Sequence, residues 1–159
     1  MTSGPDPQPF QADVLIDGDV PVDQERLLVD ALARLGVTAR TRVVPARRGV
    51  QELGWVVLAS LPLQAFLTKL GSSVAEEAVQ GLRSLVRRLL HRDAPTPAEG
   101  RPMVLRDAAT GLEVVLEPDL PDEAFRALVG LDLSQFELGP VHFDRHQGRW
   151  RSELDEASR

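Results

Sequence analysis

The stretch that decides the fold reads LGWVVLASLPLQAFLT, residues 53–68, and holds 16 consecutive residues without a charge. A membrane-spanning helix needs about 20 predominantly apolar residues. This run is shorter and is interrupted by Pro62 and Gln64. We therefore expect it to lie in the core of a folded domain and not to cross a membrane.

The apolar character continues as far as Leu90, but the segment Leu53–Leu90 is too long to be one helix. About forty helical residues would extend roughly 60 Å, whereas a domain of this chain's length is about 40 Å across. Pro62 suits the first turn of a helix, where its missing N–H is not needed, and Gly71 suits a helix terminus. Two central helices are therefore expected.

The first of these helices is predicted over Leu61–Leu70, with the hydroxyl of Ser60 as its N-cap. The second is predicted over Val74–His91, because Ser73 and Glu76 have the spacing of a capping box. Apolar residues recur along one side of the second helix and polar residues occupy the other, so this helix should be amphipathic.

Ahead of both helices, Trp55–Ala59 is either a short buried strand or the lead-in to the first helix. Periodicity cannot separate the two in so short a run. The β-branched pair Val56 and Val57 and the flanking Gly54 favour the strand.

The N-terminal part of the chain predicts a β-α-β unit after a proline-rich, disordered start over Met1–Gln11, which lacks the features of a signal peptide. Ala12–Ile16 has strand character. A helix is expected over Val22–Leu35, ended by Gly36 in a left-handed conformation. The alternation in Val37–Val43 predicts the second strand.

The C-terminal part begins, after a proline-containing linker, with a β-hairpin. Its strands are expected at Met103–Arg106 and Leu112–Leu116, and Gly111 suits a positive φ at the turn. Acidic residues crowd the start of the next apolar stretch and predict a third helix over Pro121–Val129.

A final hairpin is predicted from Val141–Asp144 and Arg149–Ser152 around Gly148, and Glu153–Arg159 is expected to fray. The fold class is therefore α+β, with one domain over residues 12–152. Its expected order is a β-α-β unit, a short buried strand, two central helices, a β-hairpin, a helix and a C-terminal β-hairpin.

Composition excludes several classes of protein and site. The absence of cysteine rules out disulfides, thiolate zinc sites and cysteine nucleophiles, and favours a cytoplasmic location. A net charge of −6 and a pI of about 5.1 argue against a nucleic-acid-binding protein. No cofactor is expected, since nucleotide-binding and metalloprotease motifs are missing from the sequence.

One spacing suggests a metal site, because His142, Asp144 and His146 would share a face if they lay on one strand. The turn expected around Gly148 would instead point His146 away from His142. We therefore expect no bound metal, and keep a metal-dependent enzyme at these residues as the weakest alternative.

Charge is distributed unevenly along the chain. Residues 1–39 carry seven acidic and two basic residues, residues 40–92 three acidic and nine basic, and residues 93–159 fourteen acidic and seven basic. The apolar segment thus lies in the net-positive part. Two explanations remain open: an acidic element balances the basic helix within the fold, or Arg83, Arg87 and Arg88 bind an acidic protein or an anionic membrane.

Five stretches, taken in order, carry a resemblance to a known family: Trp55–Ala59, Leu61–Leu67, Leu85–Arg88, Val104–Asp107 and Gly111–Val114. Their arrangement resembles that of the effector-associated constant component proteins of actinobacterial conflict systems, and of small uncharacterised proteins of similar bacteria. The resemblance covers roughly residues 12–116, and the third helix and final hairpin depart from it. It implies a non-catalytic accessory role beside an effector protein.

The leading functional hypothesis is a non-enzymatic interaction or adaptor module, in a bacterial defence or signalling assembly, that binds an acidic partner protein. Its expected contact residues are Arg83, Arg87, Arg88 and Trp55. The alternative is a peripheral membrane protein that attaches to an anionic surface through Trp55–Leu70 and the neighbouring basic helix.

Overall fold

The computed structural model describes residues 10–18, 20, 22–45, 57–72, 75–90 and 102–158. Its main sheet has five strands: β1 (Phe10–Asp17), β2 (Val37–Val44), β3 (Val57–Leu61), β4 (Met103–Asp107) and β5 (Glu113–Leu116). Five α-helices and one 3₁₀ helix are described: α1 (Val22–Arg34), α2 (Leu63–Ser72), α3 (Ala75–Leu90), α4 (Asp122–Val129), α5 (Glu153–Ala157) and η2 (Leu133–Gln135). A separate hairpin consists of β6 (His142–Asp144) and β7 (Arg149–Arg151).

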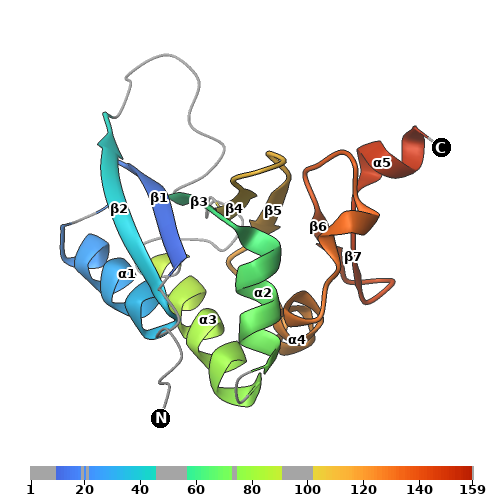
Figure 1. Cartoon of the computed structure of the whole chain (residues 1–159). Helices are drawn as coiled ribbons and strands as arrows, with labels where there is room; N and C mark the ends of the chain where they lie inside the picture. Colours follow the sequence, from blue (N-terminus) through green and yellow to red (C-terminus); the bar gives the residue numbers. More distant parts are fainter. Residues whose placement is uncertain are drawn as a thin grey trace, which may run out of the picture.

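The sheet is mixed, with the strand order β2-β1-β3-β4-β5 (Figure 1). Helix α1 connects the parallel pair β1 and β2, and α2 and α3 connect the parallel pair β3 and β4. Parallel neighbours need such crossover connections, whereas the antiparallel pair β4 and β5 needs only a turn. The fold is therefore α+β, as the sequence predicts.

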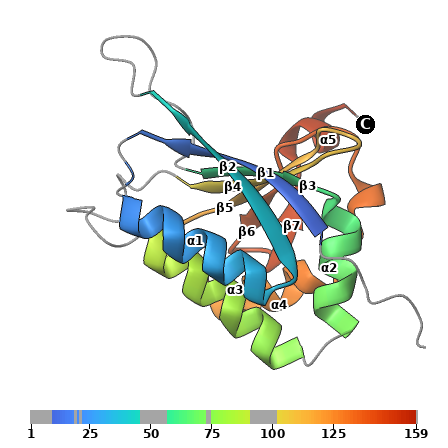
Figure 2. The ribbon, with the colours of Figure 1, turned by 60° about the vertical axis from the view of Figure 1, so that its left-hand side comes forward.

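Helices α1, α2, α3 and α4 lie together on one face of the sheet (Figure 2). Strand alternation supplies the apolar surface beneath them: Ala12, Val14 and Ile16 of β1 are buried, whereas Gln11 and Asp13 are exposed. The opposite face has a smaller apolar cluster of Leu58, Val104 and Val115. The main core therefore lies between the sheet and the helical layer.

The N-terminal boundary predicted from the sequence is wrong by two residues. Phe10 and Gln11 belong to β1, in register with Val37 and Thr38 of β2. Phe10 also packs edge-on against Phe66 of α2, with the ring centroids 6.4 Å apart. These long-range contacts order residues that proline-rich composition alone assigned to a disordered start.

The central segment contains the buried strand that Val57 and its neighbours favour, and this strand is β3. The predicted N-cap is wrong, because Ser60 lies within β3 and the helix begins only at Leu63. The backbone N–H of Leu63 instead donates to the carboxylate of Asp107, 3.3 Å away on β4. The predicted capping serine, Ser73, lies outside the described residues.

The longer central helix, the first hairpin and the third helix are confirmed as α3, β4–β5 and α4. The glycines expected to turn the chain do so with positive φ: 83° at Gly36, 78° at Gly111 and 66° at Gly148. Only a glycine adopts this left-handed conformation without steric cost.

The final hairpin is also confirmed, and it joins the main core. Val141 bridges to β5: its N–H donates to Glu113 O at 2.8 Å, and its carbonyl accepts from Val115 N at 3.0 Å. The indole N–H of Trp150 donates to Ala124 O at 2.9 Å, in a buried position on α4. The hairpin is therefore attached both to the sheet and to the helical layer.

The predicted fraying of Glu153–Arg159 is wrong for its described part. Residues Glu153–Ala157 form α5, and the hydroxyl of Ser152 caps it by accepting from Asp155 N at 3.2 Å. Glu156 pairs with Arg149 and Arg151 of β7, which holds the helix against the hairpin.

Candidate functional site

Two of the arginines expected to form a binding surface are paired within the fold. The guanidinium of Arg83 lies 2.7 Å from the carboxylate of Asp122, and that of Arg87 lies 3.8 Å from the same group. Asp122 is in the first turn of α4, which packs beside α3. An acidic element does balance this side of the basic helix, which is the first of the two explanations left open by the sequence.

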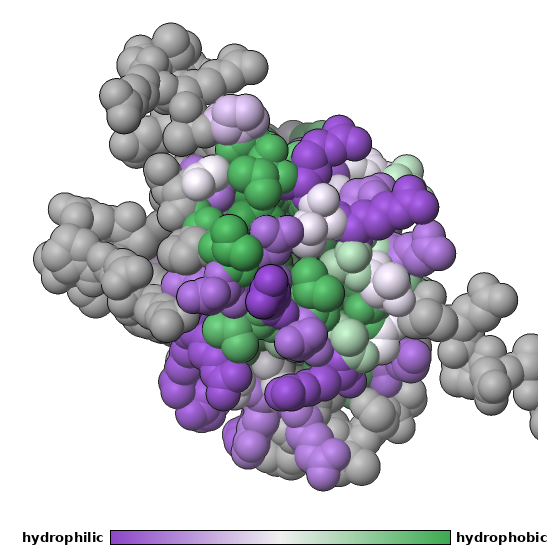
Figure 3. Space-filling model, turned by 90° about the vertical axis from the view of Figure 1, so that its left-hand side faces the viewer, coloured by the Kyte–Doolittle hydropathy of each residue, from purple (hydrophilic) through white to green (hydrophobic). Residues whose placement is uncertain are grey.

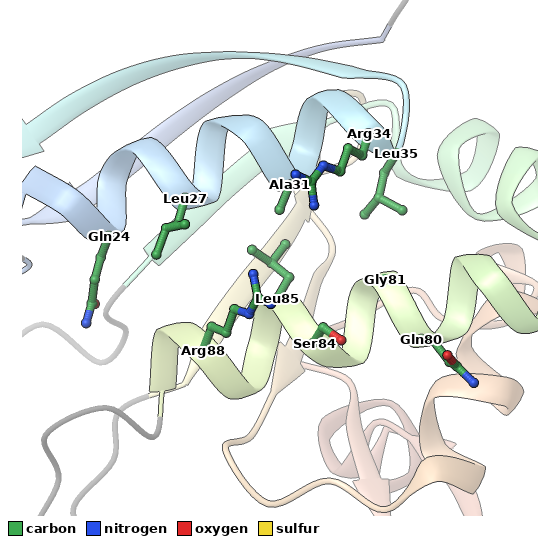
Figure 4. Close-up of a pocket in the computed structure, with 10 residues that line it drawn as sticks. All are labelled: Gln24, Leu27, Ala31, Arg34, Leu35, Gln80, Gly81, Ser84, Leu85 and Arg88. Carbon is green, nitrogen blue, oxygen red and sulfur yellow. The ribbon is translucent and has the colours of Figure 1, made fainter.

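The third arginine, Arg88, points to another side of α3. Residues four apart share a helix face, so Arg88 lies with Ser84, and both line a hollow between α3 and α1 (Figure 4). There α1 and α3 form the walls of an open groove of about 230 Å³. The residues of this α1–α3 groove are Gln24, Leu27, Ala31 and Arg34 from α1, Leu35 directly after it, and Gln80, Gly81, Ser84, Leu85 and Arg88 from α3.

The middle of the groove is apolar. Leu85 is buried, Ala31 and Leu35 are half-buried, and Leu27 is 40% exposed. The two walls are close together at Gly81, where an added Cβ would lie 3.3 Å from Leu35 Cδ2. A larger residue at this position would therefore press against Leu35.

The groove also has two basic groups, one on each wall. Arg34 near the end of α1 and Arg88 of α3 extend their guanidinium groups into it from opposite helices (Figure 4). Within the described part of the chain, neither of them forms an ion pair. Both positive charges are thus available to an anionic group that enters the groove.

The α1 wall also contributes a polar group. Gln24 is buried, with 5% of the residue exposed, yet no described residue forms a hydrogen bond with its side-chain amide. An amide carries two donors and an acceptor with two lone pairs, so Gln24 could pair with polar atoms of a ligand.

The H-x-D-x-H stretch forms a turn, as expected. The carboxylate of Asp144 accepts from the backbone N–H groups of His146 at 2.8 Å and Gln147 at 3.0 Å, and also pairs with Arg151. The hydrogen bond from Arg151 is the main reason why the pKa of Asp144 lies below its ordinary value. Among the described residues, no three metal-ligating side chains come together.

The large apolar side chains of the segment invoked for membrane attachment lie in the core wherever they are described. Leu63, Phe66 and Leu67 of α2 are buried, and so are Val57 and Leu61 of β3. Trp55, the remaining expected contact residue, lies outside the described residues. None of the described helices has the length and apolar character that crossing a membrane requires.

The sequence contains a signal for the groove that the prediction of Arg83, Arg87 and Arg88 does not use. The apolar residues of α1 cover more than one face, since Leu28 and Leu32 are buried in the core whereas Leu27, Ala31 and Leu35 line the groove. An apolar stripe wider than the roughly 100° that one contact needs indicates a second contact surface.

The chain was compared with protein families, curated proteins and solved structures. No protein-family model, no curated protein and no solved structure matches the chain. The resemblance to the effector-associated constant component proteins therefore stays a prediction.

Proposed function

We propose that the chain is a non-enzymatic interaction module whose α1–α3 groove binds an acidic, amphipathic helix of a partner protein. The observation that carries the proposal is the pair Arg34 and Arg88, on opposite walls of an apolar groove and without ion-pair partners among the described residues. An adaptor role in a bacterial defence or signalling assembly, which the resemblance implies, is compatible with such a site.

The shape of the groove favours a helix as its occupant. It lies between two helices that run side by side (Figure 2), and a third helix can place its own apolar stripe between them, in the helix-in-groove mode of recognition. Leu27, Ala31 and Leu85 would receive apolar anchors spaced three or four residues apart.

The charges favour an acidic occupant. Carboxylates on either side of the apolar stripe would meet Arg34 on one wall and Arg88 on the other. Charge-assisted hydrogen bonds between guanidinium and carboxylate groups are about twice as strong as neutral ones. A basic or neutral amphipathic helix would leave both arginines unpaired, so the site should discriminate by charge.

Selection from a displayed library of amphipathic helices of the same length as α3, 16 residues, tests this proposal. We expect the selected peptides to be enriched in Glu and Asp flanking Leu at helical spacing. When a selected peptide is added to the protein, the NMR chemical shifts of the protein's backbone amides should change most at Leu27, Ala31, Ser84 and Leu85.

Charge-reversal variants inside and outside the groove distinguish binding in the groove from general electrostatic attraction. Arg34→Glu with Arg88→Glu should weaken the selected peptides at least about tenfold, because repulsion replaces two attractive contacts. Arg26→Glu, on an exposed part of α1 outside the groove, should leave the affinity unchanged. Equal loss in both variants, or peptides without acidic enrichment, would refute the proposal. Flotation with phosphatidylserine vesicles that depends on Arg34 and Arg88 would replace it with membrane binding.

A further inference from the structure

We infer that the edge of β2 that no described strand covers is a second docking site, which binds an acidic, extended segment of a partner by adding a strand to the sheet. This site is separate from the α1–α3 groove and rests on different residues. It deepens the role of an interaction module without depending on the groove.

Strand β2 ends the sheet and pairs only with β1 among the described strands. Phe10 N donates to Gly36 O at 2.9 Å and Gly18 N donates to Val44 O at 2.8 Å, so the even-numbered residues of β2 bond to β1. In a parallel ladder the intervening residues direct their N–H and C=O groups the other way. These residues are Val37, Ala39, Thr41 and Val43.

The side chains beside this edge set the charge of what can bind. Thr38, Arg40 and Arg42 are exposed on the sheet face opposite the helices. Arg40 has Asp13 as its neighbour on β1, but Arg42 has Leu15. No described acidic group forms an ion pair with either arginine. An incoming strand therefore meets two positive charges at alternate positions.

The other side of the edge is apolar except at Thr41, whose hydroxyl donates to the carboxylate of Glu25 at 2.7 Å. Val43 is 52% exposed, and Val22 at the start of α1 is also exposed. The acidic residues of an added strand would therefore face the arginines, and its uncharged residues this side. Figure 3 shows the side of the molecule on which α1 and β2 lie, where hydrophobic side chains gather between hydrophilic ones. An added strand could place an apolar residue beside Val43 while its alternate residues face Arg40 and Arg42.

A second copy of this chain fits the edge poorly. Antiparallel pairing of two β2 strands in the registers with the largest overlap places Arg40 opposite Arg40 or Arg42 of the second copy. Like charges directly opposite each other destabilise a sheet, and charged side chains are a common protection of edges against self-association. The same arginines attract a strand with Glu or Asp at alternate positions.

A peptide in which Glu alternates with Thr, with one central Val, tests the inference against its Lys-for-Glu counterpart. We expect the Glu peptide to bind at least about tenfold more tightly, measured by fluorescence anisotropy at low salt. Hydrogen exchange should slow at the amides of Val37, Ala39, Thr41 and Val43. Equal affinity of the two peptides, or protection confined to other amides, would overturn the inference.

Variants of both the charges and the backbone sharpen the test. Arg40→Glu with Arg42→Glu should reverse the preference between the peptides, whereas Arg26→Glu should not. Ala39→Pro removes an N–H that faces away from β1, a position that edge strands tolerate, and should abolish binding while the charges stay in place.

Two further measurements separate the outcomes. Arg34→Glu with Arg88→Glu should leave binding of the extended peptide intact, so the groove and the edge can fail independently. Sedimentation that shows a dimer, with protection of the same β2 amides in the absence of peptide, would assign the edge to a second copy and overturn the acidic occupant.

Discussion

The Arg83 guanidinium lies 2.7 Å from the Asp122 carboxylate and so joins α3 to the first turn of α4. The pair converts part of the basic face of α3 from a free surface into an internal contact. Arg88 lies on another side of α3. Of the three arginines Arg83, Arg87 and Arg88, it is the one that lines the α1–α3 groove.

The Arg83–Asp122 pair should contribute little to stability by itself. The two side chains are 32% and 47% exposed, and exposed pairs contribute roughly 0.2–1 kcal/mol. A double-mutant cycle with Arg83→Ala and Asp122→Ala, measured by urea unfolding, should give a coupling energy within this range that falls at high salt. Arg88→Ala is the control, since Arg88 forms no ion pair with Asp122. A coupling above about 2 kcal/mol would contradict the expectation.

Asp107 should stabilise the fold through the start of α2. Its carboxylate accepts from Leu63 N at 3.3 Å and from the Thr110 hydroxyl at 2.7 Å. Partial burial raises the pKa of Asp107, but the hydrogen bonds from Thr110, Leu63 and Ala109 together outweigh it, and the pKa lies below its ordinary value of 3.8. Asp107→Ala should cost about 1 kcal/mol at neutral pH.

The pH dependence follows from the lowered pKa. The unfolded chain binds the proton more readily than the folded protein, so this stabilisation is present above about pH 4 and is lost as the pH falls through the folded-state pKa. Urea unfolding of the wild type and Asp107→Ala should therefore converge in acid. The exposed Asp30→Ala serves as the control, and a difference that stays constant down to pH 2.5 would exclude this account.

Gly36 should be the glycine least tolerant of substitution in the N-terminal half. Its φ is 83°, and an added Cβ would lie 2.9 Å from Lys69 Nζ. A left-handed conformation costs other residues roughly 1–2 kcal/mol, so Gly36→Ala should lower the free energy of unfolding by at least about this amount. Gly130→Ala is the matched control at another helix end, with φ −97° and open space around the new Cβ. Equal effects of the two changes would rule out this reason.

Trp150 should couple the C-terminal hairpin to the rest of the domain. Its indole donates to Ala124 O at 2.9 Å, and its ring packs against Phe143 with the centroids 5.5 Å apart. Trp150→Phe removes this hydrogen bond, and a typical buried hydrogen bond contributes about 0.5–1.5 kcal/mol. Urea unfolding followed by far-UV circular dichroism should show the whole transition shifted to lower denaturant. A shift confined to a small separate transition would mean that the hairpin folds on its own.

The order of elements was predictable because its signals are local. Apolar periodicity, the acidic first turn of α4 and the glycines at positions 36, 111 and 148 each act within a few residues, and each prediction is confirmed. The start of α2 was not predictable in this way. Ser60 has the right residue type for a cap, but the carboxylate that Leu63 contacts is 44 residues away in the sequence.

The candidate sites were even less predictable than the start of α2, because they are formed by segments that are distant in the sequence. Among the arginines that the charge pattern singled out, Arg83 and Arg87 are paired with Asp122, and only Arg88 lines the groove. Arg34, Arg40 and Arg42 could not be predicted as site residues, because their neighbours along the chain do not indicate that they lie beside a groove or at the edge of a sheet.

The sequence by itself determined that this chain is an α+β domain, the order of its elements from β1 to β7 and the glycines that turn it, because these properties come from side-chain periodicity and backbone preferences over short range. Only the tertiary structure decided that β3 lies between β1 and β4, that Asp122 pairs with Arg83 and Arg87 of α3, and that α1 and α3 enclose a groove. The physical reason is that burial and ion pairing depend on distance in space, and packing brings together residues that the chain keeps far apart.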